Sequence, residues 1–149
     1  MIEERLAELG IELPTVAPPV AAYVPVRLAG GLAFVSGQVP DGGKLHPGHL
    51  GAEVSLEQGQ EAARRCALQA LAVLREALGS LDRVRGIAKV EVFVASAPGF
   101  TDQHLVANGA SELLGEVFGE AGKHARAAIG VAELPLGACV EVALVAEIA

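Results

Sequence analysis

Large aromatic side chains are scarce in this sequence. Of its 149 residues only 3% are aromatic and none is Trp, whereas 52% are hydrophobic. A core of ordinary packing density must therefore be built mainly from Ala, Val, Leu and Ile. The length favours one domain, and we expect a single domain over residues 1–149, in which residues 1–16 form an N-terminal helix and leader.

Cysteine is equally rare. The two cysteines, Cys66 and Cys139, lie far apart and do not have the spacing of a metal site. Each lies in an apolar run, which is typical of a buried free thiol. We interpret them as thiols in a reducing compartment and expect a cytoplasmic protein.

Long apolar runs and an excess of positive charge are also missing. No run approaches the ~20 residues that a membrane-spanning helix needs. The first residues, "MIEERLAELG", are charged and lack the apolar segment of a signal peptide, so we expect no membrane partner. The formal net charge is -7. Because binding to phosphate requires a basic face, no nucleic-acid partner is expected.

Hydrophobic periodicity predicts two long helices and about five strands after a short N-terminal helix. A proline-rich stretch that contains Pro14, Pro18, Pro19 and Pro25 is expected to be an extended connector. The predicted helices cover 2–10, 55–79 and 101–122, and the predicted strands cover 26–29, 32–40, 86–96, 125–135 and 138–149.

The long helix from residue 55 has the clearest end signals. Ser55 followed by Gln58 fits a capping box, and Gly79 can end the helix. In the second long helix, Asn108 and Gly109 are expected to be a weak point.

The order of these elements favours an α+β domain of two layers, in which two helices cover one face of a mostly antiparallel sheet. The opposite face would carry small apolar residues. It is either an ordinary core face or an oligomer interface, since a monomer rarely exposes such a face.

Two charged residues lie inside apolar, strand-like segments. Arg126 begins the run "ARAAIGV", where it is either a strand-end charge that reaches water or a clamp for an anion. Glu141 lies in the middle of "CVEVALV", where it either faces solvent or lines a site. Tyr23 is the only tyrosine, and simple packing would explain it.

Other catalytic patterns are weak. His46 and His49 in "HPGH" have no clear third ligand, so a solvated loop is the favoured interpretation and no metal site is expected. No Ser-His-Asp or Cys-His arrangement is evident. Ser36 is not in the G-x-S-x-G context of a nucleophilic serine.

Several segments resemble the RidA/YjgF family of reactive-intermediate (enamine/imine) deaminases, whose members have also been described as L-PSP endoribonucleases. The resemblance runs in family order from about residue 17 to the C-terminus, and the pattern R-x-x-x-x-V-x-x-L-P from Arg126 to Pro135 is its most specific part. The extra N-terminal helix is similar to a longer branch of the family. The matching segments are "PPVAAYVP", "AFVSGQVP", "KVEVFVASAPGF", "HARAAIGVAELP" and "VEVALVAEIA".

The resemblance implies a chorismate-mutase-like fold and a homotrimer whose sheets form a central β-barrel. Ligand clefts would lie between subunits. The implied reaction is the hydrolysis of 2-imino or enamine acids, which pyridoxal-phosphate enzymes release, to 2-keto acids and ammonia. The implied substrate carries a carboxylate, and no metal or organic cofactor is implied.

The resemblance also assigns roles to particular residues. Arg126 matches the arginine that binds the substrate carboxylate, and Glu141 matches the acidic residue that orients or activates the attacking water. Tyr23 matches a tyrosine that lines the cleft. Ser36 and Gly37 match the strand segment that borders it.

This sequence departs from the family pattern at two positions. Many deaminating members have Cys or Ser where this chain has Ala128, and a second glutamate where it has Ala143. The first change removes a hydroxyl or thiol from the cleft. The alternative to catalysis is therefore a trimer that binds small 2-keto or carboxylic acids without turnover. RNA cleavage or translation inhibition is a further alternative, disfavoured by the acidic charge and the lack of aromatic stacking surfaces.

Overall fold

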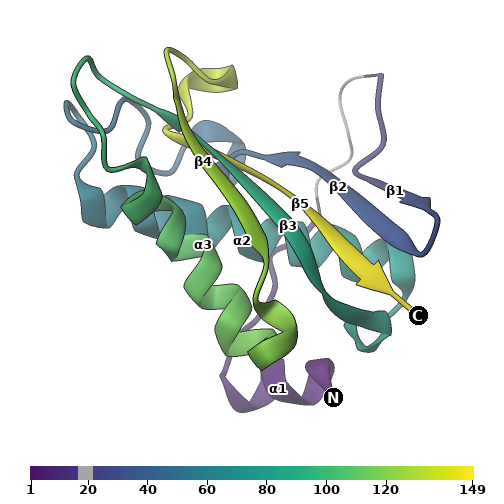
Figure 1. Ribbon diagram of the computed structural model, residues 1–149. Coiled ribbons are helices and arrows are strands. Elements are labelled where there is room, and N and C mark those ends of the chain that lie inside the picture. Colours follow the sequence, from purple (N-terminus) through teal and green to yellow (C-terminus); the bar gives the residue numbers. More distant parts are fainter. Residues whose placement is uncertain (17–21) are drawn as a thin grey trace.

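The structure is a computed structural model that describes residues 1–16 and 22–149. The middle of the proline-rich connector, including Pro18 and Pro19, lies outside the described residues. Figure 1 shows a twisted sheet with the two long helices on one side and a short N-terminal helix beyond them. The helices are α1 (Ile2–Glu8), α2 (Leu56–Leu78) and α3 (Gln103–Phe118), and the strands are β1 (Val26–Ala29), β2 (Leu32–Gln38), β3 (Val84–Ala95), β4 (Ala125–Val131) and β5 (Val140–Ile148).

The five strands form one mixed sheet in the order β1-β2-β5-β3-β4. The β1/β2, β2/β5 and β3/β5 pairs are antiparallel, and only β3 and β4 are parallel. The predicted α+β class, two long helices and five strands are confirmed. β4 and β1 are the two edges of the sheet, and this placement determines which candidate site residues can meet.

Local sequence signals explain the ends of α2 and the first hairpin. The Ser55 side chain accepts the Gln58 N–H, and the Gln58 side chain accepts the Ser55 N–H, so the predicted capping box is confirmed. Gly79 ends the helix with φ +85°. Gly30 and Gly31, with φ of +58° and +76°, form the turn between β1 and β2, where a side chain would be strained.

The core lies between the sheet and the helices. In β3 the alternate residues Val90, Val92 and Val94 are buried on the helix side, while Glu91 and Phe93 on the other face are half-buried. The opposite face is less covered: Phe34 is 43% exposed and Ile129 48%. An apolar face left this open favours the oligomer interface over the ordinary core face.

The expected weak point at Gly109 is wrong. α3 is continuous through Gly109, where its backbone passes close to α2. A Cβ atom at Gly109 would overlap the carbonyl oxygen of Gln60 and lie 2.9 Å from its Cα. Glycine is therefore needed here for close packing of the two helices.

We expect Gly109→Ala to lower the free energy of unfolding by about 1–3 kcal/mol, because the backbone of α2 cannot yield as a side chain would. Gly115→Ala is the matched control in the same helix, since a Cβ atom there meets nothing within 4 Å. That change should raise stability by up to about 1 kcal/mol through helix propensity. Denaturant unfolding of both variants measures the contrast, and a stabilised Gly109→Ala would contradict the packing argument.

Among the described residues, no helix combines the length and hydropathy needed to cross a membrane.

Candidate functional site

Arg126 lies on the edge strand β4 and is held by α3. It is opposite Val90 in the parallel pair, so its side chain starts on the helix side of the sheet. Nη1 donates to Asn108 Oδ1 at 2.8 Å and to Ser111 Oγ at 3.1 Å, and Nη2 donates to the carbonyl oxygen of His104 at 3.2 Å. These contacts fix the direction of an otherwise flexible side chain.

The contacts leave part of the Arg126 guanidinium available. Its Nε–H and one Nη2–H have no hydrogen-bond partner among the described residues. These two nitrogens form one side of the guanidinium fork, which can hold a carboxylate through two hydrogen bonds. The described residues also place no carboxylate in an ion pair with Arg126. The arrangement favours the anion clamp over a strand-end charge that merely reaches water.

The spacing of the residues that hold Arg126 could have been recognised in the sequence. His104, Asn108 and Ser111 are separated by four and three residues, so they lie along one face of α3. This polar stripe lies on the side of α3 that holds Arg126.

Glu141 lies on the other face of the sheet. It is opposite Phe93 in the β3/β5 pair, whereas its neighbours Val140 and Val142 are buried on the helix side. The carboxylate is half-buried and has no hydrogen-bond partner among the described residues. Burial raises the pKa of the Glu141 carboxyl above its ordinary value. A carboxylate with a raised pKa and free lone pairs is suited to accept a proton from water.

Gly37 makes room for this carboxylate. β2 has an irregularity between Val35 and Gln38. A Cβ atom at Gly37 would overlap Glu141 Oε2 and lie 2.8 Å from Cδ. The backbone of β2 thus forms one wall beside the Glu141 carboxylate.

Ser36 and Tyr23 lie next to Gly37. Ser36 Oγ donates to the carbonyl oxygen of Val24 at 2.7 Å, and the Ser36 N–H donates to that of Pro25 at 2.9 Å. These bonds tie the segment that carries Tyr23 to β2. Tyr23 is 53% exposed and, with Gly37 and Gln38, lines a cleft of about 480 Å³.

The predicted site residues therefore fall into two groups. Ser36, Gly37 and Glu141 lie on β2 and β5, and Tyr23 lies in the segment bonded to Ser36, whereas Arg126 lies on an edge strand and starts from the face opposite to that of Glu141. One chain does not bring Arg126 together with the other four.

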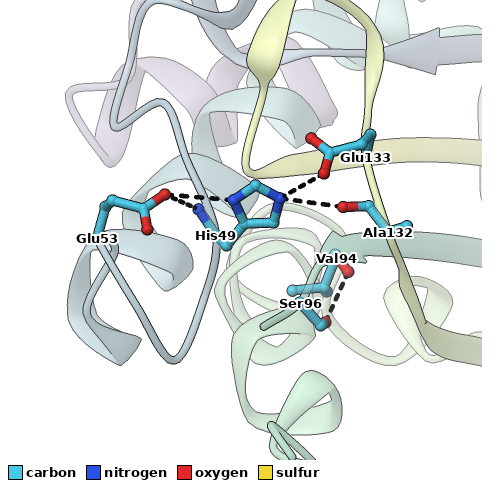
Figure 2. A network of polar contacts seen from close by, with 6 residues as sticks. All are labelled: His49, Glu53, Val94, Ser96, Ala132 and Glu133. Carbon is cyan, nitrogen blue, oxygen red and sulfur yellow. Dashed lines mark hydrogen bonds and ion pairs between the residues drawn. The ribbon is translucent and has the colours of Figure 1, made fainter. Parts of the chain in front are cut away.

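The "HPGH" segment is not the solvated loop that the sequence suggested. The His49 ring accounts for much of the difference, because it bridges two parts of the chain (Figure 2). Nδ1 lies 3.2 Å from Glu53 Oε1, and Nε2 lies 3.0 Å from both the Ala132 carbonyl oxygen and Glu133 Oε2. The neighbouring Leu50 is fully buried and hydrogen bonds through its backbone to Ala95. Sequence analysis missed the contacts of His49 with Ala132 and Glu133 because those residues lie 83 and 84 positions further along the chain.

The two histidines of this segment do not share a set of ligands. His46 Nε2 lies 3.3 Å from Glu61 Oε2, whereas His49 contacts Glu53 and Glu133. The described residues contain no group of three or more His, Cys, Asp or Glu that could hold a metal ion.

His49 should make the stability of the protein depend on pH. Hydrogen bonds to Glu133 and Glu53 raise the pKa of His49, and the hydrogen bond with His49 lowers the pKa of Glu53. A raised histidine pKa stabilises the fold below the unfolded-state value of about 6.5, and this contribution is lost as the pH rises through the folded-state pKa. We therefore expect His49→Gln to lower the melting temperature more at pH 6 than at pH 9.

The control for this prediction is His104→Gln, since the His104 ring makes no hydrogen bond among the described residues. Thermal unfolding of the three proteins at both pH values makes the comparison. An equal loss for His49→Gln at pH 6 and pH 9 would show that ring charge does not matter.

Ser111 and His124, which sequence analysis did not combine, lie beside Arg126. Ser111 Oγ is 2.8 Å from His124 Nε2, and His124 Nδ1 is 2.6 Å from the Gly122 carbonyl oxygen. The serine comes from α3 and the histidine from the loop before β4, so no short sequence motif predicts the pair.

Comparison with known proteins agrees with this fold and these segments. The family model described as "YjgF/chorismate_mutase-like, putative endoribonuclease" matches residues 3–148. The chain is 49% identical to Protein TCP17 of Trypanosoma cruzi over 150 residues, which cover 99% of this chain and 94% of that protein.

Solved structures of related proteins also match nearly the whole chain. The protein Atu1372 of Agrobacterium tumefaciens, of unknown function, is 46% identical with a TM-score of 0.90, over 99% of this chain and 92% of that one. The "putative endoribonuclease" of Shewanella oneidensis MR-1 is 36% identical with a TM-score of 0.93, over 99% of both chains. The chain belongs to the YjgF/RidA family, with its chorismate-mutase-like fold.

Proposed function

We propose that this protein is a hydrolase that converts 2-imino and enamine acids to 2-keto acids and ammonia. The observation that carries the proposal is the held but incompletely used guanidinium of Arg126. α3 fixes Nη1 and Nη2, and the Nε side stays available for a carboxylate. A planar fork fixed in advance loses little freedom on binding and determines where the neighbouring imine carbon lies.

The complete site would form between subunits of a homotrimer. Arg126 lies on the edge strand β4, whereas Glu141 lies on the central strand β5, Gly37 and Ser36 lie on the neighbouring β2, and Tyr23 lies in the segment bonded to Ser36. A second copy could place its β2/β5 group against the first copy's β4 edge. The exposed apolar side chains on the open face, such as Phe34 and Ile129, support burial of that face in a central barrel.

In this site Arg126 would hold the substrate carboxylate, and Glu141 would take a proton from water as the water adds to the imine carbon. Glu141 then returns that proton to the imine nitrogen, so the product of addition carries a hydroxyl and an amino group on one carbon. Its collapse expels ammonia and leaves the 2-keto acid. The raised pKa of Glu141 brings the base nearer to neutral pH, where general-base catalysis is more effective.

Small apolar residues lie beside both Arg126 and Glu141. Ala128 follows Arg126 on the same face of β4 and is opposite the buried Val92. Ala143 lies on the same face as Glu141 and is opposite Glu91. Small residues at both positions leave space, so we expect imines with larger side chains to be accepted.

The proposed location is the cytoplasm. Cys66 and Cys139 are buried and unpaired, as predicted. Burial raises the pKa of the Cys139 thiol to about 11, which keeps it protonated. Such thiols are suited to a reducing compartment.

The proposed activity is tested by coupled turnover. An amino-acid oxidase generates 2-imino acids in place, and formation of the 2-keto acid and ammonia is followed with and without this protein. The imines of alanine, leucine and methionine test side chains of increasing size.

Acceleration by this protein supports the deaminase. If no imine is accelerated while 2-keto acids still bind, as calorimetry would show, the protein is a binding module instead.

A further inference from the structure

The hydrogen bonds around His124 define which of its ring nitrogens carries the proton in the neutral imidazole. The Gly122 carbonyl oxygen can only accept, so the Nδ1 that lies 2.6 Å away carries hydrogen. Nε2 then holds a lone pair. Ser111 Oγ, 2.8 Å from Nε2, must donate its proton to that nitrogen.

Ser111 therefore has the surroundings of an activated hydroxyl. Its proton points at a base, and the base is oriented by a third group, here a backbone carbonyl. This is the arrangement that activates serine nucleophiles on unrelated folds. The Ser111 oxygen also accepts from Arg126 Nη1 at 3.1 Å, which leaves it one further lone pair for attack.

The pair opens into a cavity. A hollow of about 450 Å³ is lined by Ser111, Gly115, Gly122, Lys123, His124 and Arg126. A Cβ atom at Gly115 would meet nothing within 4 Å. Lys123 and Arg126 make the hollow basic, and the Lys123 ion pair with Glu120 is largely exposed and so weakly held.

We propose that Ser111 and His124 form a nucleophile–base pair that hydrolyses small esters carrying a carboxylate. Ser111 Oγ attacks the ester carbonyl carbon while its proton passes to His124 Nε2. The carbon–oxygen bond to the alcohol breaks, and the alcohol leaves with that proton. Water then attacks the acyl-serine, His124 accepts and returns its proton, and the carboxylic acid is released.

The basic groups at the hollow have two roles in this scheme. Arg126 Nη1 donates to Ser111 Oγ at 3.1 Å and so favours the alkoxide character that this oxygen gains as its proton passes to His124. Lys123 offers a site for the carboxylate of the ester. The scheme uses neither Glu141 nor a second chain, so it does not depend on the proposed imine hydrolysis.

The test is covalent labelling of the intact protein with diisopropyl fluorophosphate, read by mass spectrometry and peptide mapping. We expect one adduct, on Ser111. Ser111→Ala and His124→Gln should lose it, whereas the matched controls Ser96→Ala and His104→Gln should keep it. Glu141→Gln should also keep it while losing imine turnover, which separates the two activities.

Hydrolysis completes the test. The folded wild-type protein should cleave 4-acetoxybenzoate with kcat/KM about tenfold above that for phenyl acetate, since only the first carries a carboxylate. Absence of an adduct on the wild-type protein, or an adduct that survives His124→Gln, would overturn the proposal. Loss of imine turnover in Ser111→Ala without any labelling of wild type would overturn it too, because the pair would then only position Arg126.

Discussion

Arg126→Ala is expected to lower kcat/KM for 2-imino acids by about 10³-fold or more, because it removes both hydrogen bonds to the carboxylate and the positioning they provide. Arg126→Lys keeps the charge but not the planar fork. Its loss should be intermediate, about 10- to 100-fold. The measurement is the oxidase-coupled assay described above.

Arg85→Ala is the control for this prediction. Arg85 is exposed on β3 and makes no hydrogen bond or ion pair among the described residues, so its removal should leave turnover unchanged. If Arg126→Ala were as active as Arg85→Ala, the guanidinium would not bind substrate, and the proposed function would lose its main support.

Gly37→Ala should reduce kcat about 10²-fold while leaving the fold intact, a loss typical of a displaced catalytic group. The added Cβ would overlap the Glu141 carboxylate, which ends a flexible side chain and can swing away. The backbone at Gly37 has no positive φ, so alanine is not strained there. Thermal unfolding should show little change, and the turnover assay should show the loss.

A double variant separates this effect from a general disturbance of β2. If Gly37→Ala acts by moving Glu141, it should cost nothing further in the Glu141→Gln background. Multiplied losses in Gly37→Ala/Glu141→Gln would mean that the two residues act independently.

The parts of the fold that sequence predicted well depend on local rules. The capping box at Ser55 and the stop at Gly79 involve residues within one helical turn. The alternation of Val90, Val92 and Val94 needs only the two-residue repeat of a strand. Each was confirmed because its cause lies within a few residues of its effect.

Contacts between distant segments were not predictable in the same way. The His49 ring meets Glu133, and the Gly109 backbone meets Gln60, only after the sheet and helices have packed. The sequence around His49 suggested a solvated loop, and the propensity of Gly109 suggested a weak helix. Tertiary packing overrides both local signals.

In the candidate site, too, local sequence signals were predictable and contacts between distant segments were not. Arg126 and Glu141 were recognisable as charges in apolar strands. That they start from opposite faces of one sheet follows from the strand order and register. The Ser111–His124 pair depends on how the loop before β4 returns past α3, which no local pattern specifies.

The central claim is that Arg126 of one subunit and Glu141 of another form a single site. Mixing two inactive variants tests it most directly. Arg126→Ala and Glu141→Gln are co-expressed with different tags, and mixed oligomers are isolated and assayed with 2-iminopropionate. Each mixed trimer has one interface, of its three, that carries both intact residues, so about one third of wild-type turnover should return. If the mixed oligomers form and stay inactive, Arg126 and Glu141 do not complete a shared site, and the account is wrong.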